Sequence, residues 1–148
     1  MNRTITRHDP RLSAWRTFLR AHSLVIRELE RELQDEQRMA LTDYDVLVQL
    51  SMAPHRRLRM SELADRLTLS RSGATRLVDR LVGQGLVARA TCDTDRRGQW
   101  AELTDAGLDR LRTASPTHLR GVGAHFLDRL DADDLAALER ALERVIPD

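Results

Sequence analysis

The stretch from residue 61 to residue 81 constrains the fold of this chain more than any other part of the sequence. Thr68, Leu69 and Ser70 predict a tight turn, and Ser61 is the expected N-cap of a short helix before it. Gly85 is placed to end the helix that follows the turn. Apolar residues recur at helical spacing on both sides of the turn: Leu63, Ala64 and Leu67 before it, and Ala74, Leu77, Val78 and Leu81 after it. The pattern predicts a helix-turn-helix.

The second of these helices carries small polar and basic residues on the faces that its apolar residues leave free. Arginine can bond guanine O6 and N7 in a bidentate manner, while serine and threonine hydroxyls can bond bases or phosphates. We therefore expect a recognition helix for the major groove of duplex DNA, although an ordinary amphipathic helical hairpin has the same apolar pattern. The predicted DNA-contacting residues of this helix and its cap are Ser70, Arg71, Ser72, Thr75, Arg76 and Arg80.

A charged β-hairpin is predicted directly after Gly85. Residues 86–91 and 99–103 are typical of two strands, and Cys92–Gly98 forms the polar turn between them. Two guanidinium groups on a protruding turn, those of Arg96 and Arg97, are suited to an adjacent minor groove, and Asp95 could orient Arg97 through a bidentate pair. The alternative is a solvated turn whose ion pairs contribute less than about 1 kcal/mol each.

The distribution of charge agrees with one basic surface. All basic residues are arginine, and the formal net charge is only +1. Residues 55–97 hold 10 arginines and 5 acidic residues, whereas residues 98–148 hold 6 arginines and 10 acidic residues. A basic middle segment in a nearly neutral chain indicates a surface that meets phosphates, unless arginine only replaces lysine throughout a chain of biased composition.

Long helices flank this middle segment. The N-terminal one is a heptad pattern on one helical face: Leu12, Trp15, Leu19, His22, Ile26, Leu29 and Leu33. A helix that buries Tyr44, Leu47 and Leu50 is expected to begin with Thr42 as N-cap, paired with Asp45 in a capping box, and to end before Pro54.

The C-terminal third predicts two further helices. Thr104 is the expected N-cap of the first, which Pro116 should kink or break. Asp131, with Asp134 three residues on, is the expected N-cap of the second. The fold class is therefore mainly α with a small β-hairpin wing.

Several of these segments, in the same order along the chain, resemble the MarR family of transcriptional regulators. The resemblance rests on SELA from Ser61, SRSGATRLVDRL from Ser70, GLVAR from Gly85, DRR from Asp95 and LTDAG from Leu103. It implies a single MarR-type domain over residues 1–148, with dimerisation helices at 10–38 and 104–147 and a winged helix-turn-helix at 41–103. It also implies a homodimeric repressor that binds inverted-repeat operator DNA and is released by a small phenolic or lipophilic effector, or by oxidants.

On this resemblance Asp95 and Arg97 take the Asp-x-Arg roles of the wing. Gly73 departs from the bulkier residue that is more usual at its position in the recognition helix. His22, the polar member of the heptad pattern, is a candidate effector-binding residue, with Trp15 and Tyr44 as candidate pocket walls, although core or interface packing is the more common role of such residues.

Other kinds of site have little support. The single cysteine, Cys92, excludes an internal disulfide and is read as a passive thiol rather than a redox sensor. Apart from His118 and His125, which are seven residues apart, no Cys or His pair has metal-ligand spacing, and we expect no metal site. No catalytic or cofactor motif is present, so neither an enzyme nor a cofactor is expected. Without a membrane span or a signal peptide in the sequence, we expect a cytoplasmic location. The alternatives to a regulator are a protein-interaction module and a ligand carrier, each with a winged fold and no DNA role.

Overall fold

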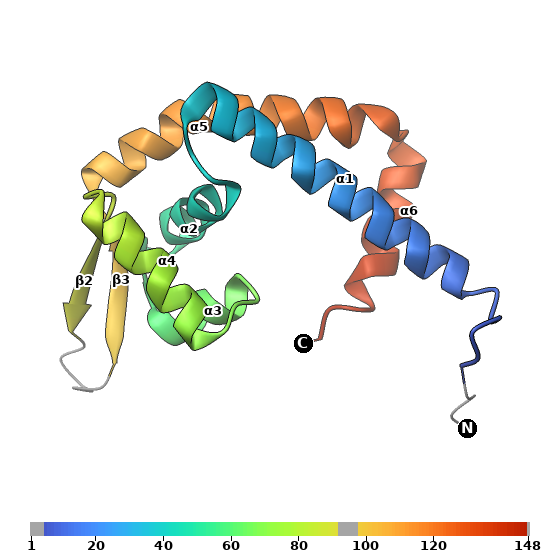
Figure 1. The fold of residues 1–148 in the computed structure, drawn as a ribbon, viewed down its shortest axis with the longest axis horizontal. Coiled ribbons are helices and arrows are strands. Elements are labelled where there is room, and N and C mark those ends of the chain that lie inside the picture. The colour runs from blue at the N-terminus through green and yellow to red at the C-terminus, as the bar shows by residue number, and fades with distance from the viewer. Residues whose placement is uncertain (1–4, 92–97, 148) are drawn as a thin grey trace. The chain divides into compact units, whose positions relative to one another are not determined.

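The computed structural model describes residues 5–91 and 98–147, and these divide into two compact units (Figure 1). Unit 1 comprises Met1–Arg31 and Leu119–Asp148, and unit 2 comprises Glu32–His118. The elements in chain order are α1 (Leu12–Gln37), α2 (Leu41–Met52), η1 (Pro54–Arg56), β1 (Arg57–Arg59), α3 (Met60–Arg66), α4 (Arg71–Gly83), β2 (Val87–Thr91), β3 (Gln99–Leu103), α5 (Asp105–His125), η2 (Leu127–Arg129) and α6 (Ala132–Glu143). The helices α1 and α5 each contribute to both units.

Unit 2 holds the hydrophobic core. Leu47 and Leu50 of α2 pack with Leu63 of α3 and Leu81 of α4, and all four side chains are fully buried. Among the described residues, every buried apolar side chain except that of Leu29 belongs to this unit. Burial of this kind contributes roughly 1.5–3 kcal/mol per large side chain, so it fixes how α3 and α4 are held.

A three-stranded antiparallel sheet closes unit 2, in the order β1-β3-β2. Leu58 pairs with Ala101, and Val87 pairs with Leu103, which places these buried residues on the inner face of the sheet. The two wing strands were predicted, but β1 was not. It has only three residues, two of which are arginines, so it carries no alternating pattern that a sequence could reveal.

Two predicted N-caps are confirmed and two are wrong. Asp131 accepts a hydrogen bond from the backbone amide of Asp134, and Thr104 caps α5 in the same way by accepting the Gly107 amide. However, α2 follows Ala40 rather than Thr42, because burial of Leu41 extends the helix toward its N-terminus.

The second incorrect cap is Ser61. With Ser61 as N-cap the helix would begin at Glu62, but α3 begins two residues earlier, at Met60, after Arg59 in an extended conformation. The Arg59 amide donates to a carboxylate oxygen of Glu62 at 3.2 Å, which is half of a capping box and fixes the earlier start.

Pro116 was predicted to kink or break its helix. A break is wrong, because α5 continues through this residue from Asp105 to His125, and the kink stays a prediction. The neighbouring side chains explain the continuity. Leu111, Ala114 and Thr117 are buried in unit 2, so packing holds both sides of the proline in helical register.

Both helices of the helix-turn-helix end in the same left-handed turn. Thr68 has φ 54°, and the next amide, that of Leu69, donates to the carbonyl of Ala64 at 2.8 Å. Gly85 has φ +74°, and the amide of Leu86 donates to the carbonyl of Leu81 at 3.0 Å. This closure is typical of a Schellman motif and ends α4 where the sequence predicts.

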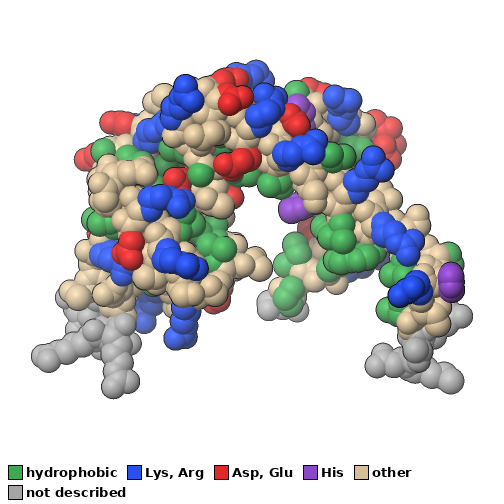
Figure 2. All heavy atoms as spheres, viewed as in Figure 1, with side chains coloured by type: hydrophobic (Ala, Val, Ile, Leu, Met, Phe, Trp, Pro, Cys, Tyr) green, Lys and Arg blue, Asp and Glu red, His purple; other side chains and the backbone are tan. Residues whose placement is uncertain are grey.

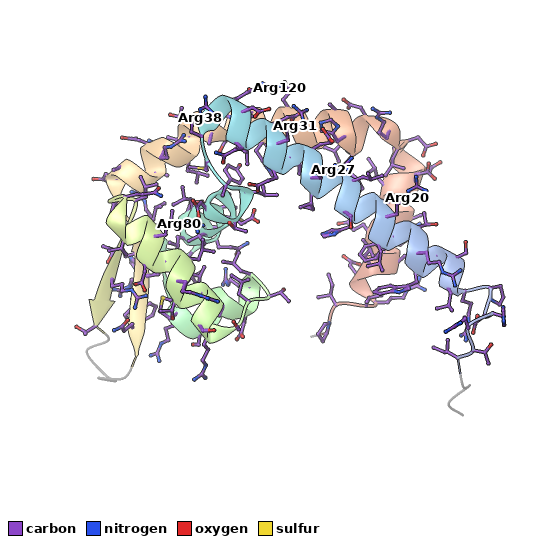
Figure 3. All side chains as sticks on the ribbon, viewed as in Figure 1. Arg20, Arg27, Arg31, Arg38, Arg80 and Arg120 are labelled. Carbon is purple, nitrogen blue, oxygen red and sulfur yellow. The ribbon has the colours of Figure 1, made fainter. Side chains whose placement is uncertain are left out.

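Unit 1 is helical and leaves most of its apolar residues exposed. Within the described part of the chain, α6 has no buried residue, and no helix is long and apolar enough to cross a membrane. Figure 3 shows Arg20, Arg27 and Arg31 along α1. The exposed large apolar side chains of unit 1 are Ile5, Trp15, Phe18, Leu19, Leu24, Ile26, Leu119, Leu127, Val145 and Ile146.

Candidate nucleic-acid interface

The recognition helix predicted from the sequence is α4, and its polar residues are exposed on unit 2. Its apolar residues Ala74, Leu77, Val78 and Leu81 are buried, which leaves the opposite face free. Arginine side chains are visible on the surface of unit 2, as they are on unit 1 (Figure 2). The exposed face includes four of the predicted DNA-contacting residues: Arg71, Ser72, Thr75 and Arg76.

Ser70 has a structural role in addition to the predicted one. Its hydroxyl oxygen accepts the Gly73 amide at 3.1 Å and lies 3.2 Å from the Ser72 hydroxyl. A Cβ atom at position 73 would lie 3.1 Å from the Ser70 hydroxyl oxygen, which is tighter than ordinary contact. Gly73 therefore gives the capping hydroxyl room to approach the first turn of α4.

Arg80 lies further along α4 and binds an acidic residue of the scaffold. Its guanidinium donates a hydrogen bond to the carboxylate of Asp43 on α2, and Figure 3 labels its position on α4. The side chain of Asp43 is 10% exposed and that of Arg80 is 51% exposed. A charge as buried as that of Asp43 needs a partner, so this pair fastens α4 to α2, while the predicted DNA contact of Arg80 stays a prediction.

Arg89 of β2 provides a second link to α4, one that the sequence did not predict. Its guanidinium lies 2.9 Å from the Asp79 carboxylate and donates to the Gln99 side chain at 2.5 Å. It also donates to the backbone carbonyl of Thr75 at 3.4 Å. Arg89 therefore joins the recognition helix to both strands of the wing, and the GLVAR segment was its only signal in the sequence.

Trp100 of β3 carries two guanidinium groups on the outer face of the sheet. The guanidinium carbon of Arg57 lies 4.9 Å from the ring centroid and that of Arg59 lies 5.3 Å from it. Both distances are within the range of a cation–π interaction. The sequence analysis missed this cluster because it depends on the pairing of β1 with β3.

A cleft of about 360 Å³ opens where β1, α3, α4 and β3 meet. Arg59 and Ser61 line it from one side, Arg71 and Thr75 of α4 from another, and Gln99 from the start of β3. Its position brings predicted contact residues of the recognition helix together with residues from outside that helix.

The predicted wing-tip residues Asp95, Arg96 and Arg97 lie outside the described residues, as does Cys92. Among the described residues, no group of three His, Cys, Asp or Glu side chains is placed to hold a metal ion.

The three candidate effector-binding residues lie in different units. In unit 2, Tyr44 is buried, its ring centroid lies 4.3 Å from that of His118, and its hydroxyl donates to Ser115 Oγ at 3.3 Å. In unit 1, Trp15 and His22 each lie 6.2 Å from the ring of Phe18, and both are exposed. Their common role in an effector pocket stays a prediction.

Desolvation by burial lowers the pKa of His118 below its ordinary value of 6.5. The neutral imidazole is therefore favoured beside the ring of Tyr44.

Comparisons with known proteins agree with this geometry. A family model described as "MarR family" matches residues 39–98. The HTH-type transcriptional repressor MdtR of Bacillus subtilis is 33% identical over 75 residues, which are 51% of this chain and 48% of that protein. The chain thus spans about half the length of the curated relatives it matches.

Solved structures match over nearly the whole chain. AbsC, a MarR family transcriptional regulator from Streptomyces coelicolor, is 37% identical with a TM-score of 0.86, and the match covers 97% of this chain and 95% of that one. Sco3205, another MarR family regulator from that organism, solved in complex with DNA, is 36% identical with a TM-score of 0.88, over 98% of this chain and 89% of that one.

The helices α3 and α4, followed by the hairpin β2–β3, define a winged helix-turn-helix protein. The likeness to AbsC over nearly the whole chain and the family-model match over residues 39–98 identify one family within this class. The chain belongs to the MarR family, whose members are transcriptional regulators.

Proposed function

We propose that this protein is a sequence-specific DNA-binding regulator of transcription that acts as a homodimeric repressor in the cytoplasm. The observation that carries the proposal is the exposed polar face of α4, held on unit 2 by the Arg80–Asp43 and Arg89–Asp79 pairs. A helix that is fixed at both sides and free on one face can enter a major groove without rearranging.

The relatives support DNA binding and a role as a repressor. The structure of Sco3205 contains DNA, and MdtR is named a transcriptional repressor. The similarity to these relatives and the exposed residues of α4 together favour direct reading of bases by Arg71 and Arg76. Ser72 and Thr75 would contact bases or phosphates.

The apolar surface of unit 1 supports the homodimer. Soluble monomers rarely expose many large apolar side chains on one set of helices, and Trp15, Leu119 and Val145 are all more than half exposed. A two-fold dimer would place its recognition helices about 34–36 Å apart on successive major grooves, so the operator should be an inverted repeat.

Release from DNA by a small phenolic or lipophilic effector is the remaining part of the proposal. Its support is the family membership and the aromatic candidates Trp15, His22 and Tyr44. Titration of the protein–DNA complex with a panel of phenolic and other lipophilic compounds tests it. We expect an active compound to release the wild-type protein from DNA. Tyr44→Phe or His22→Gln should weaken this response to the compound.

The central experiment selects DNA from a randomised duplex pool with the full-length protein and measures binding by fluorescence anisotropy. We expect an inverted-repeat consensus and strong salt dependence. Arg76→Ala and Arg97→Ala should weaken binding to the selected duplex, whereas Arg112→Ala, an exposed arginine of α5 paired with Asp109, should not. Recovery of no preferred sequence, together with unchanged binding by both variants, would overturn the proposal.

A further inference from the structure

Gln99, the first residue of β3, lies beside the N-terminal half of the recognition helix. Its exposed side chain lines the same cleft as Arg71 and Thr75 of α4. A molecule that contacts these two residues of α4 can therefore reach Gln99 as well. The residue is neutral and belongs to the sheet, so neither the helical spacing nor the charge of the sequence singled it out.

The orientation of the Gln99 amide is fixed by Arg89 of β2. Arg89 Nη1 donates to Gln99 Oε1 at 2.5 Å, while Nη2 lies 2.9 Å from the carboxylate of Asp79 and donates to the carbonyl of Thr75 at 3.4 Å. A guanidinium group has only donors, so it has to bond the oxygen of the amide and not its nitrogen. Gln99 Nε2, with its two N–H donors, is consequently the atom that can bond a further partner.

An amide that offers its nitrogen is suited to one kind of DNA contact. Bidentate pairing of glutamine with adenine uses the amide oxygen and nitrogen together, and the oxygen of Gln99 is already bonded to Arg89. A backbone phosphate has only acceptors, so the N–H donors alone are enough to bind it, and glutamine side chains commonly make such bonds. The geometry therefore favours a phosphate over a base as the partner of Gln99.

We propose that Gln99 donates a hydrogen bond from Nε2 to a phosphate of the DNA backbone, and that Arg89 is the positioning residue that orients its amide. The proposal rests on the DNA-binding function proposed above and adds a contact from the sheet to those expected from α4. Because Gln99 is neutral, the bond displaces no counterion and reads no base. Its contribution to affinity is therefore the same for every DNA sequence and nearly the same at every salt concentration.

The first test compares Gln99→Ala with the wild type on the duplex selected by the wild type and on a mixed-sequence duplex, over a range of salt concentrations. We expect the affinity to fall about tenfold on both duplexes, because a hydrogen bond to a charged group is lost. The slope of affinity against salt concentration should not change, whereas the loss of an arginine that binds a phosphate reduces that slope by about one.

Gln99→Glu distinguishes a DNA contact from a purely structural role. Glutamate keeps an oxygen for Arg89 and strengthens that bond by its charge, so the midpoint of thermal unfolding should not fall. Its second oxygen replaces the amide nitrogen and repels a phosphate, so the DNA affinity should fall further than in Gln99→Ala.

Gln84→Glu is the matched control for this variant. Gln84 is exposed, follows the C-terminal end of α4 and does not line the cleft, so the substitution adds the same charge to unit 2 away from the proposed contact. Because salt screens such a charge, the DNA affinity should change less than about twofold. An equal loss of affinity in Gln84→Glu and Gln99→Glu would overturn the proposal, since the added charge would then act without a local contact.

A double-mutant cycle tests the role of Arg89. Arg89→Lys keeps a positive charge for Asp79 but loses the planar fork that also reaches Gln99. Gln99→Ala should therefore cost less DNA affinity in the Arg89→Lys background than in the wild type. Equal costs in the two backgrounds would overturn the positioning role of Arg89. Circular dichroism confirms that each variant folds.

The outcomes separate this proposal from the function on which it rests. A wild-type protein that binds no DNA removes both. Sequence-specific binding by the wild type, with the same affinity in Gln99→Ala, overturns the phosphate contact and leaves the DNA-binding function intact. A loss confined to the selected duplex would also overturn the contact, because Gln99 would then read a base.

Discussion

The two units of this protein use their apolar residues in opposite ways. Unit 2 buries Leu47, Leu63 and Leu81 completely, and the polar face of α4 is positioned by that core. Unit 1 leaves Trp15, Leu119 and Val145 mostly exposed, although its helices have regular apolar spacing. The same pattern of spacing thus produces a folded core in one unit and an uncovered surface in the other. The difference supports the proposed homodimer, in which a partner surface would cover the exposed apolar residues of unit 1.

The largest effect that tests this contrast is expected from the core of unit 2. Leu47→Ala should lower the free energy of unfolding by about 2–5 kcal/mol, because it removes fully buried methyl groups and leaves a cavity. Urea unfolding at two protein concentrations measures it. The loss should be the same at both concentrations, whereas Leu119→Ala in unit 1 should produce a loss that changes with concentration. If the loss in the free energy of unfolding depends on protein concentration in the same way for both variants, the contrast between the units is contradicted.

Trp15→Ala should weaken dimerisation by about 2 kcal/mol, or about 30-fold in the dissociation constant, because large aromatic side chains dominate protein interfaces. Sedimentation equilibrium measures the change. Arg20→Ala, on another face of α1, is the control and should change dimerisation little (Figure 3). A wild-type protein that remains monomeric at micromolar concentration would contradict the interpretation of unit 1.

Ser70 caps α4 in unit 2 and Asp131 caps α6 in unit 1, which allows a matched pair of smaller changes. Ser70→Ala in α4 and Asp131→Ala in α6 each remove an acceptor for a backbone amide, that of Gly73 or Asp134, and should each cost about 1 kcal/mol. Amide hydrogen exchange reports the two helices separately. Only Ser70→Ala should also weaken DNA binding, so an equal loss of DNA affinity in Asp131→Ala would contradict the assignment of the interface to unit 2.

The smallest effect concerns pH. The pKa of His118 is lower in the folded protein than its ordinary value of 6.5, so the unfolded chain binds a proton more readily. Stability should therefore fall as the pH decreases below about 6.5, until the folded protein is protonated as well. His118→Phe keeps a ring against Tyr44 and should reduce this dependence in urea titrations at pH 5 and pH 7.5. An unchanged dependence in the variant would assign the titration to another group.

Periodic patterns predicted most of the fold. The four buried residues of α4, its stop at Gly85 and the caps Thr104 and Asp131 all follow from local spacing and local hydrogen bonds. Except at Ser61, where the local hydrogen bond between Arg59 and Glu62 sets the start of α3, the errors have a common cause, because tertiary packing overrode a local signal. Burial of Leu41 moved the start of α2, packing on both sides of Pro116 kept α5 continuous, and β1 exists only because β3 lies beside it.

Contacts that depend on tertiary packing could not be predicted for the interface either. Exposed residues of α4 could be predicted because the helical repeat separates them from the buried face. Arg89 and Trp100 could not be assigned, since their partners Asp79, Gln99 and Arg59 reach them only through strand pairing and helix packing. The sequence thus predicts which side chains point outward, whereas the contacts that hold them in position need the fold.

The double attachment of α4 has a consequence for the thermodynamics of DNA binding. Asp43 holds Arg80 on one side of the helix, and Arg89 holds Asp79 on another, so we expect α4 to change little when DNA binds. Association then involves little coupled folding, and the heat capacity change on binding should match the surface buried between rigid partners. A heat capacity change more negative than this would have to come from unit 1 or from the DNA. Calorimetry therefore tests whether a part of the complex other than α4 reorganises on binding.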